Sequence, residues 1–344
     1  MTETKLNWGI MTTGSIARTF ATDLASSRTG RLAAVGSRNS GTASSFAQDF
    51  GGVRAHGSYE TLLADPDVQV VYVATPHPLH SAWAIRSAEA GKHILCEKPL
   101  ALNRAEAERM IAAARRHRVF LMEAFMYRCH PQTAALAALI RDGAIGELRL
   151  IRAAFSVRLS YDPEHRMFKR ESGGGAILDL GCYPVSFARL MAGAACGRPF
   201  AEPVEFRASG RLHPEARSDE YAAAVAKFPG DVVAELSCGS TVLNDISAQL
   251  CGTKGRITIP MPFFPGLGGR DERIFLHRAD TIAPEKIVFP GGGVPLYARE
   301  ADVVGDALAR NEQESLAMSH ADTLGNMAVL DDWRAQVGVT YPGE

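Results

Sequence analysis

The sequence predicts an α/β protein in which a doubly wound parallel sheet is followed by a second unit with a mostly antiparallel sheet. Short apolar segments alternate with helical patterns through the first third of the chain, and strand-like segments joined by short turns dominate the second half. A length of 344 residues, 46% of them hydrophobic and 22% charged, suits about two domains with substantial cores.

The first third of the chain predicts right-handed βαβ units. Each apolar or β-branched segment is followed by a helical pattern, and this alternation places helices on both faces of a parallel sheet. We expect strands at residues 6–10, 31–36, 68–73, 93–96 and 119–122, and helices at residues 16–24, 43–50, 80–90 and 104–117.

The remainder predicts an α+β unit. A strand-like run at residues 147–159 precedes a helix at residues 176–191 that is apolar on nearly every side and is therefore expected to be buried. Turn sequences such as Pro229-Gly230-Asp231 separate the segments that follow, which indicates antiparallel neighbours. We expect these strands at residues 221–228, 232–240, 247–251 and 256–259, closing helices at residues 299–309 and 318–337, and a division into domains at residues 1–125 and 126–344.

A turn of small residues follows the first strand, and residues 12–17 read Thr-Thr-Gly-Ser-Ile-Ala. This is a degenerate dinucleotide fingerprint, Gly-x-Gly-x-x-Gly/Ala, with Thr12 in place of the first glycine. Gly14 would let the backbone approach a pyrophosphate at a helix N-terminus, where amide donors and the helix dipole favour anions. The alternative is a tight βα turn without a ligand. Because further βα units follow, we expect a Rossmann domain whose phosphate loop consists of Thr12, Thr13, Gly14, Ser15 and Ile16.

The end of the second strand predicts which dinucleotide binds. An NAD site needs Asp or Glu about 20 residues after the glycines, whereas this chain has Ser37 and Arg38 there with no acid nearby. A hydroxyl and a guanidinium suit a 2′-phosphate, so we predict NADP(H) rather than NAD(H); the alternative is an arginine that only caps a strand. The third strand ends in residues that we expect to line the cofactor crevice, with His80 capping or lining it rather than acting as a base. These residues are Thr75, Pro76, His77 and His80.

The motif Glu97-Lys98-Pro99 lies at the carboxyl end of a short apolar strand. Open α/β sheets form their ligand crevice at this end of the strands. In a partly desolvated crevice, Lys98 would have a lowered pKa or would hold a positive charge beside a reacting oxygen. The alternative is a surface lysine paired with Glu97.

A carboxylate and a phenol, Asp179 and Tyr183, lie four residues apart in the apolar helix predicted at residues 176–191. This spacing places both side chains on one face, and an isolated carboxylate in such a helix is costly unless it has a partner. The preceding glycines at residues 173–175 allow close backbone approach, with Ser172 as the expected N-cap. Either Asp179 is a structural acceptor for the tyrosine hydroxyl, or Tyr183 transfers the proton of an alcohol while Asp179 orients substrate hydroxyls.

Together these motifs resemble the glucose–fructose oxidoreductase / inositol dehydrogenase superfamily (Gfo/Idh/MocA) over almost the whole chain. The matching segments are residues 14–17, 74–80, 91–99, 122–131 and 173–183. The last two look most like the branch that contains dimeric dihydrodiol dehydrogenase and NADP-dependent D-xylose dehydrogenase. The usual glycine at the position of Thr12 is missing, which affects the expected geometry of the phosphate loop and not the fold.

The resemblance implies a Rossmann domain followed by an α+β domain whose large open sheet joins subunits, so that a homodimer or higher homo-oligomer is expected. It implies that Lys98 and Tyr183 act in catalysis with Asp179 beside them, that Glu97 and Lys98 also border the cofactor, and that Arg166 helps to shape the substrate pocket. The implied activity is NADP(H)-dependent hydride transfer between nicotinamide and a sugar, cyclic polyol or diol.

Two alternatives to a freely exchanging dehydrogenase stay open. The first is a non-catalytic nucleotide-binding regulator or partner-binding protein of the same fold, and the second is an oxidoreductase that never releases its cofactor. Nicotinamide binding without turnover would favour the first, and absorbance of the purified protein would reveal the second.

Composition and charge argue against several other classes. The formal net charge is −1 with a pI near 6.8, which speaks against nucleic-acid or membrane partners. The first residues lack the apolar core of a signal peptide, and no run approaches the ~18 apolar residues of a membrane span. Six scattered cysteines and ten dispersed histidines show no metal-ligand spacing. We therefore expect a cytoplasmic protein with reduced cysteines and no metal.

Overall fold

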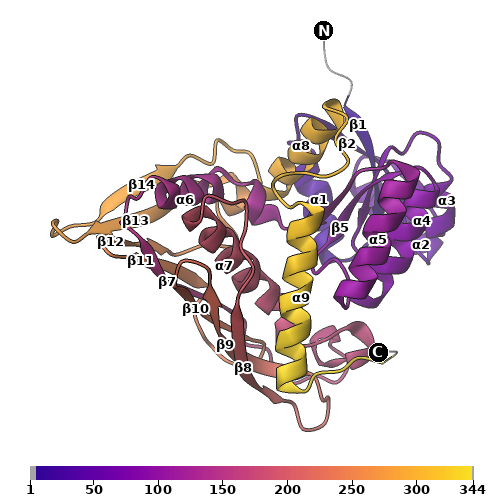
Figure 1. Ribbon diagram of the computed structural model, residues 1–344. Helices are drawn as coiled ribbons and strands as arrows, with labels where there is room; N and C mark the ends of the chain where they lie inside the picture. Colours follow the sequence, from indigo (N-terminus) through magenta and orange to yellow (C-terminus); the bar gives the residue numbers. More distant parts are fainter. Residues whose placement is uncertain (1–4, 343–344) are drawn as a thin grey trace.

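The computed structural model describes residues 5–342, which form two sheets with helices packed on them (Figure 1). The first sheet has six strands, all parallel, in the order β3-β2-β1-β4-β5-β6. The strand order reverses between β1 and β4, and such a switch point is where open α/β sheets bind their ligands. The strands are β1 (Leu6–Met11), β2 (Gly30–Gly36), β3 (Arg54–His56), β4 (Val70–Val73), β5 (His93–Glu97) and β6 (Leu121–Ala124).

Helices connect these strands as the βαβ pattern predicts. β3 and α3 are not expected from the sequence, because each is too short to show a hydrophobic period and β3 lies at the sheet edge with little burial. The helices are α1 (Ser15–Leu24), α2 (Ser40–Asp49), α3 (Tyr59–Leu63), α4 (His80–Glu89) and α5 (Arg104–His117).

The second sheet has eight strands in the order β14-β13-β12-β11-β7-β10-β9-β8. All neighbours are antiparallel except β7 and β10. The α/β prediction with a large, mostly antiparallel second sheet is therefore confirmed. The strands are β7 (Leu148–Ser156), β8 (Glu205–Leu212), β9 (Asp219–Phe228), β10 (Val232–Gly239), β11 (Ser247–Gly252), β12 (Gly255–Ile259), β13 (Glu272–Arg278) and β14 (Glu285–Phe289).

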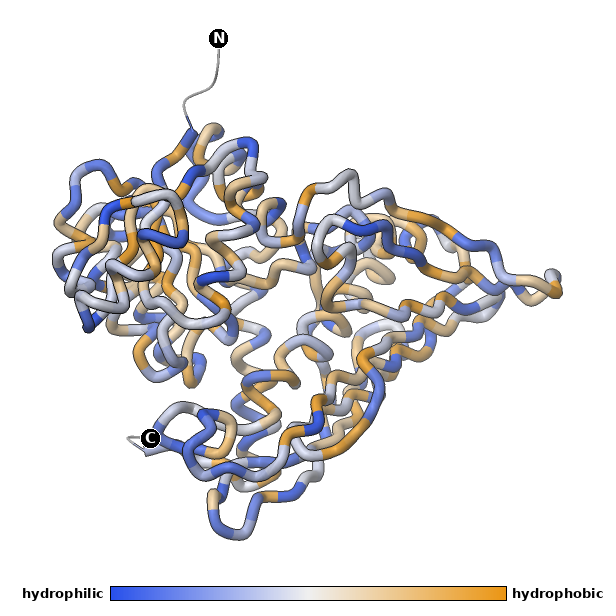
Figure 2. Tube along the Cα trace, turned by 180° about the vertical axis from the view of Figure 1, so that it is seen from behind, coloured by the Kyte–Doolittle hydropathy of each residue, from blue (hydrophilic) through white to orange (hydrophobic). Residues whose placement is uncertain are grey.

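Helices cover one face of the second sheet and leave the other face open (Figure 1). Burial alternates along β9 with a period of two residues, and Figure 2 shows hydrophobic and hydrophilic residues alternating along the long strands. The covering helices include α6, which the sequence did not predict. They are α6 (Pro131–Arg141), α7 (Cys182–Ala195) and α9 (His320–Val337).

The C-terminal segment returns to the first sheet. Helix α8 (Leu296–Ala309) packs against α1, the Tyr297 amide donates to Asp23 Oδ2 at 3.3 Å, and Arg28 binds the Asp306 carboxylate at 2.6 and 2.8 Å. Helix α9 then contacts both α5 and β8 (Figure 1). The expected division at residues 125 and 126 stays a prediction.

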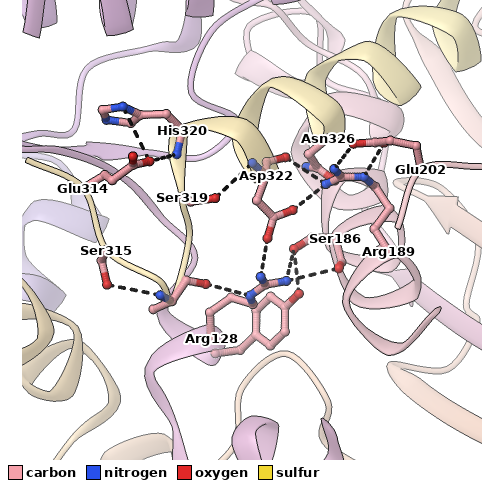
Figure 3. Close-up of polar contacts among 12 residues, drawn as sticks. Arg128, Ser186, Arg189, Glu202, Glu314, Ser315, Ser319, His320, Asp322 and Asn326 are labelled. Atoms are coloured by element: carbon pink, nitrogen blue, oxygen red, sulfur yellow. Dashed lines mark hydrogen bonds and ion pairs between the residues drawn. The ribbon is translucent and has the colours of Figure 1, made fainter. Parts of the chain in front are cut away.

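A buried ionic network fixes α7 and α9 to the segment that follows β6 (Figure 3). Arg128 forms an ion pair with Asp322 of α9 and donates to the Ser186 carbonyl of α7 at 3.3 Å. Arg189 donates to the other oxygen of Asp322 at 2.6 Å and to Glu202 at 2.6 and 3.0 Å. Arg189 and Asp322 are almost fully buried. Removing one partner of such a network typically costs about 3–5 kcal/mol, so the helix that carries Tyr183 is held firmly.

Candidate active site

A cavity of about 570 Å³ lies at the carboxyl ends of β1, β4 and β5 and extends to the second sheet. Residues far apart in the sequence meet in its wall because both domains contribute to it. Every site residue expected from the sequence lines this cavity: Thr12, Thr13, Gly14, Ser15, Ile16, Ser37, Arg38, Thr75, Pro76, His77, His80, Glu97, Lys98, Arg166, Asp179 and Tyr183.

The turn after β1 forms the part of the cavity suited to a phosphate. Thr12 has φ +88°, a conformation that favours glycine and is uncommon for other residues. The Thr12 amide donates to the Gly36 carbonyl at 2.9 Å, and its hydroxyl lies 3.3 Å from the Ala74 carbonyl. A Cβ at Gly14, the N-cap of α1, would meet only the Thr12 hydroxyl, at 4.0 Å. The space above the helix N-terminus is thus open, which fits an anionic group.

Ser37 and Arg38 lie at the carboxyl end of β2, on the edge of the same cavity. The Ser37 hydroxyl is 2.8 Å from the Thr42 hydroxyl. Arg38 interacts with the hydroxyl of Tyr59, which also lines the cavity. A guanidinium held by a phenol, with a hydroxyl beside it, fits a phosphate at this position.

Asp179 holds the cationic side chains together in the other half of the cavity. Its Oδ1 is 3.2 Å from Lys98 Nζ, which also donates to the Asp179 carbonyl at 2.8 Å. Its Oδ2 accepts from Arg166 at 2.9 Å. His77 Nε2 is 3.6 Å from Oδ1. The carboxylate therefore fixes the position of the Lys98 ammonium rather than accepting from the tyrosine hydroxyl.

The charges of Lys98 and Asp179 stabilise each other. Burial alone would lower the pKa of Lys98, but the Asp179 carboxylate raises it above its ordinary value. Burial would raise the pKa of Asp179, but Lys98, Arg166 and His77 lower it further than burial raises it. Of the two possibilities expected for Lys98, the structure therefore favours the positive charge rather than the lowered pKa.

Tyr183 lies next to the lysine in a mostly aromatic environment. Lys98 Nζ is 5.0 Å from the centre of the Tyr183 ring, and the rings of Phe125, Phe155 and Phe264 surround it at 5.2–6.2 Å. The Tyr183 hydroxyl is 3.6 Å from the Met126 sulfur. Burial, foremost, raises the pKa of Tyr183 well above its usual value, so the phenol keeps its proton and can donate it.

The two histidines contact backbone carbonyl oxygens and are uncharged near neutral pH. Burial lowers the pKa of His77 to about 3 despite the nearby Asp179, and burial also lowers the pKa of His80. His80 Nε2 is 2.7 Å from the Thr75 carbonyl and Nδ1 is 3.0 Å from the Pro99 carbonyl. His80 thus joins the turns after β4 and β5 at the cavity edge, in keeping with a lining role and not with a base.

The glycine run at residues 173–175 has a specific steric reason. A Cβ at Gly174 would lie 2.5 Å from the Arg166 carbonyl oxygen, and one at Gly175 (φ +127°) would lie 2.1 Å from Asp219 Oδ1. Asp219 of β9 accepts from the Ile177 amide at 2.6 Å. It therefore caps the segment that carries Asp179, and the expected N-cap, Ser172, does not; Ser172 instead lines the cavity.

That segment is also not regular α-helix. Residues Ile177–Gly181 form a π-helical turn before α7 begins at Cys182, and π-turns are frequent at functional sites. Lys98 nevertheless reaches both Asp179 and the Tyr183 ring, so the two side chains share a face. The sequence did not identify the capping residue Asp219 or several further wall residues. Two of these lie in segments that resemble the family but have no reactive group that marks them, Met126 and Leu180; the others lie outside any motif: Tyr59, Phe155, Phe264 and Tyr297.

No three side chains of His, Cys, Asp or Glu between residues 5 and 342 gather in a way that could hold a metal ion. Over the same residues, no helix combines the length and apolar character needed to cross a membrane.

Known proteins share this arrangement. Residues 6–125 match the model described as "Oxidoreductase family, NAD-binding Rossmann fold", and residues 133–258 match the GFO/IDH/MocA C-terminal domain. The chain is 36% identical to trans-1,2-dihydrobenzene-1,2-diol dehydrogenase of Xenopus tropicalis over 97% of this chain and 99% of that one. It is 33% identical to the Homo sapiens enzyme of the same name, over 98% of both chains.

Solved structures give the same result. A 3-ketoreductase from Actinomadura kijaniata in complex with NADP and TDP-benzene superposes with a TM-score of 0.85 at 29% identity, covering 97% of this chain and 98% of that one. An aldose-aldose oxidoreductase from Caulobacter crescentus gives a TM-score of 0.85 at 25% identity with the same coverage. This chain is a member of the GFO/IDH/MocA oxidoreductase family.

Proposed function

We propose that this protein is an NADP(H)-dependent oxidoreductase that interconverts a CH–OH group and a carbonyl in a sugar, cyclic polyol or diol. The observation that carries the proposal is the Lys98 ammonium, held by Asp179 and lying against the Tyr183 ring. These groups share one cavity with the open N-terminus of α1. The names of the relatives support this class, because they include a diol dehydrogenase, a 3-ketoreductase and an aldose oxidoreductase.

Each cavity residue has a separate task. When bound, nicotinamide supplies or accepts the hydride. Tyr183 donates a proton to the carbonyl oxygen in reduction and removes it in oxidation, as general acid and base. The Lys98 ammonium stabilises the charge that develops on that oxygen. Asp179 keeps Lys98 in place and offers a hydrogen-bond acceptor to neighbouring substrate hydroxyls. Arg166, which also donates to Asp179, borders the substrate half of the cavity.

The cofactor half of the cavity supports NADP(H). Residues 12–16 would hold the pyrophosphate, and Ser37 with Arg38 would hold the 2′-phosphate. The turn formed by Thr75, Pro76 and His77, the ring of His80 and the Glu97-Lys98 segment would border the ribose and nicotinamide. The 3-ketoreductase relative was solved with NADP, which agrees with this choice.

The test is a screen of sugars, inositols and diols with NADP⁺ and NAD⁺, followed by the absorbance of the reduced nicotinamide. We expect turnover with NADP⁺ on at least one class of polyhydroxylated or diol substrate. Preference for NAD⁺ would contradict the role given to Ser37 and Arg38. Tight nicotinamide binding with no turnover on any substrate would favour the non-catalytic regulator instead.

We also propose that the open face of the second sheet joins two copies of the chain. A row of small residues crosses five strands of this face in register: Ser247, Ala154, Ser237, Ala223 and Ser209. Exposed apolar side chains, Tyr221 and Val225, lie beside the row on β9.

The cysteines of residues 5–342 are all free, which suits the cytoplasm.

A further inference from the structure

Glu300 on α8 is a buried acid to which the proposed mechanism gives no task. It is 0% exposed, and neither of its carboxyl oxygens has a hydrogen-bond partner among residues 5–342. An ionised carboxylate in such a place would be very costly. Burial, and then the charge of Glu97, raise the pKa of Glu300 well above its usual value, so Glu300 holds a proton.

Glu300 shares its buried space with a group in the cavity wall. Its electrostatic neighbours are Tyr72 of β4, Glu97 of β5, Cys129 after β6 and Tyr297 of its own helix. Tyr72 donates a hydrogen bond to Glu97 Oε1, and the Lys98 amide lies 3.2 Å from Oε2. The rings of Tyr72 and Tyr297 both pack against Phe20 of α1. Asp23 of α1 completes the set of facing acids by accepting from the Tyr297 amide.

The cluster reaches the cofactor crevice along one edge. Glu97 and Tyr297 line the cavity, and Tyr297 is three residues before Glu300, on the same face of α8. The cations that act on Glu97 are Lys98 and Arg166, and both already pair with Asp179. Two carboxyl groups that interact in a buried space do not both ionise readily, so the pair retains a proton unless positive charge is added nearby.

We propose that the Glu97–Glu300 pair senses the charge of the nicotinamide. The pair releases a proton to solvent when the cationic, oxidised cofactor binds, and it keeps the proton when the uncharged, reduced cofactor binds. Glu300 thereby sets the relative affinity for the two forms and makes it depend on pH. This inference rests on the proposed function, because it needs a nicotinamide ring beside Glu97.

Calorimetric titration of NADP⁺ and NADPH into the substrate-free protein, in buffers with different ionisation enthalpies, counts the protons released on binding. The 2′-phosphate is common to both forms, so its own titration cancels in the difference. Wild type should release more protons with NADP⁺ than with NADPH. The NADP⁺/NADPH affinity ratio should rise with pH, by up to about tenfold per pH unit for one full proton.

The variants Glu300→Gln and Glu300→Leu should lose both the proton difference and the pH dependence of the ratio, while NADPH binding persists. Two variants guard against one failing to fold, and Glu300→Leu removes a buried polar group that has no hydrogen-bond partner among residues 5–342, which favours folding. Asp306→Asn, a half-exposed acid on the same helix, is the matched control and should behave as wild type.

Equal proton release with NADP⁺ and NADPH in wild type would overturn this inference and leave the proposed function unaffected. An undiminished difference in both Glu300 variants would do the same. Failure of wild type to bind either form would instead overturn the proposed function, and this inference with it.

Discussion

Lys98 keeps its positive charge in this site, and in the proposed mechanism this leaves the proton transfer to the neighbouring phenol. Asp179 raises the pKa of Lys98 above its ordinary value even though burial opposes this. The ammonium already donates to the Asp179 carbonyl and to Oδ1, so its main contribution is a fixed positive charge that stabilises a developing oxyanion. The phenol of Tyr183, which is protonated and adjacent, is the remaining donor. The division of work between the two residues therefore follows from the position of one carboxylate.

Replacing either residue should reduce the chemical step strongly. We expect Tyr183→Phe and Lys98→Met each to lower kcat at least ~100-fold, the lower range for loss of an acid–base group. Lys169→Met is the matched control, because Lys169 is a surface lysine paired with Glu164. Steady-state rates with the best substrate from the screen measure the effect. Near-normal turnover in both crevice variants would refute the assignment of these two residues.

Arg38 should decide between the two dinucleotides. Arg38→Leu removes one charge-assisted contact to a 2′-phosphate, and we expect the KM for NADP⁺ to rise about tenfold or more, with little change for NAD⁺. Arg31→Leu, at an exposed arginine of β2 that donates to Asn7 Oδ1, should change neither value. An equal increase in the KM for NADP⁺ and the KM for NAD⁺ in Arg38→Leu would show that Arg38 stabilises the turn after β2 but does not recognise the 2′-phosphate.

Motif residues could be located from the sequence because each has a chemical reason to stand at a strand end or helix start. Lys98, Asp179 and Tyr183 all reach the predicted cavity for this reason. Asp219 could not be found in the same way. It acts across 42 positions of the chain on the Ile177 amide, and only the packing of β9 under residues 173–177 brings it there.

Long periodic elements were predicted closely, and weakly patterned ones were missed. The expected helix at residues 104–117 is α5, with the same bounds. Strands β8 and β14 lie at the two edges of their sheet and are mostly exposed, so they have little of the apolar alternation that marks a strand. The π-helical turn at Ile177–Gly181 could not be foreseen, because its hydrophobic pattern fits an α-helix equally well.

The acid that caps this π-helical turn should give the protein a measurable pH dependence. Burial raises the pKa of Asp219 to about 6 from 3.8. The folded state therefore binds this proton more tightly than the unfolded state does. The contribution of Asp219 to the free energy of unfolding is greatest below about pH 4. It falls by up to about 3 kcal/mol as the pH rises to about 6. Urea unfolding across this range measures the decline.

In Asp219→Asn this part of the decline should disappear, because the amide does not titrate and its oxygen can still accept from Ile177. Glu123, whose pKa burial raises to about 7, contributes a decline of the same sign, which the variant keeps. Glu205→Gln, at an exposed acid of β8, should retain the full wild-type decline. An equal decline in the free energy of unfolding with pH in Asp219→Asn and in wild type would contradict the prediction.

After the last strand of the second sheet, the chain returns to the first domain. Helix α8 packs on α1, and α9 bridges α5 and β8 (Figure 1). The C-terminal segment therefore contributes to the crevice: Tyr297 of α8 lines it, and Glu300 is buried on the same helix. The order of patterns along the sequence cannot show this return, because it arises from the packing of segments about 275 positions apart.

The open face of the second sheet gives the molecule one broad surface on which a second copy can pack. Its centre is a shallow hollow of about 750 Å³, lined by the small side chains of the row from Ser247 to Ser209. The next row contains Val225, 51% exposed, between Arg207 and Glu235. In a two-fold dimer built on this face, Val225 of each subunit lies in the same interface. An aspartate there would place a charged group of each subunit in a buried contact, where its desolvation is costly.

We therefore expect wild type to sediment as a dimer or higher oligomer, and Val225→Asp to raise the dissociation constant by at least about tenfold. Ile282→Asp is the matched control, since Ile282 is fully exposed in the turn between β13 and β14, away from the central strands of the face. Sedimentation velocity over a range of concentrations measures the shift, and thermal unfolding shows whether each variant is folded. Because the cavity residues come from the other side of the sheet, a folded Val225→Asp monomer should still bind NADPH. A monomeric wild type, or a Val225→Asp protein as dimeric as Ile282→Asp, would rule out this face as the subunit contact.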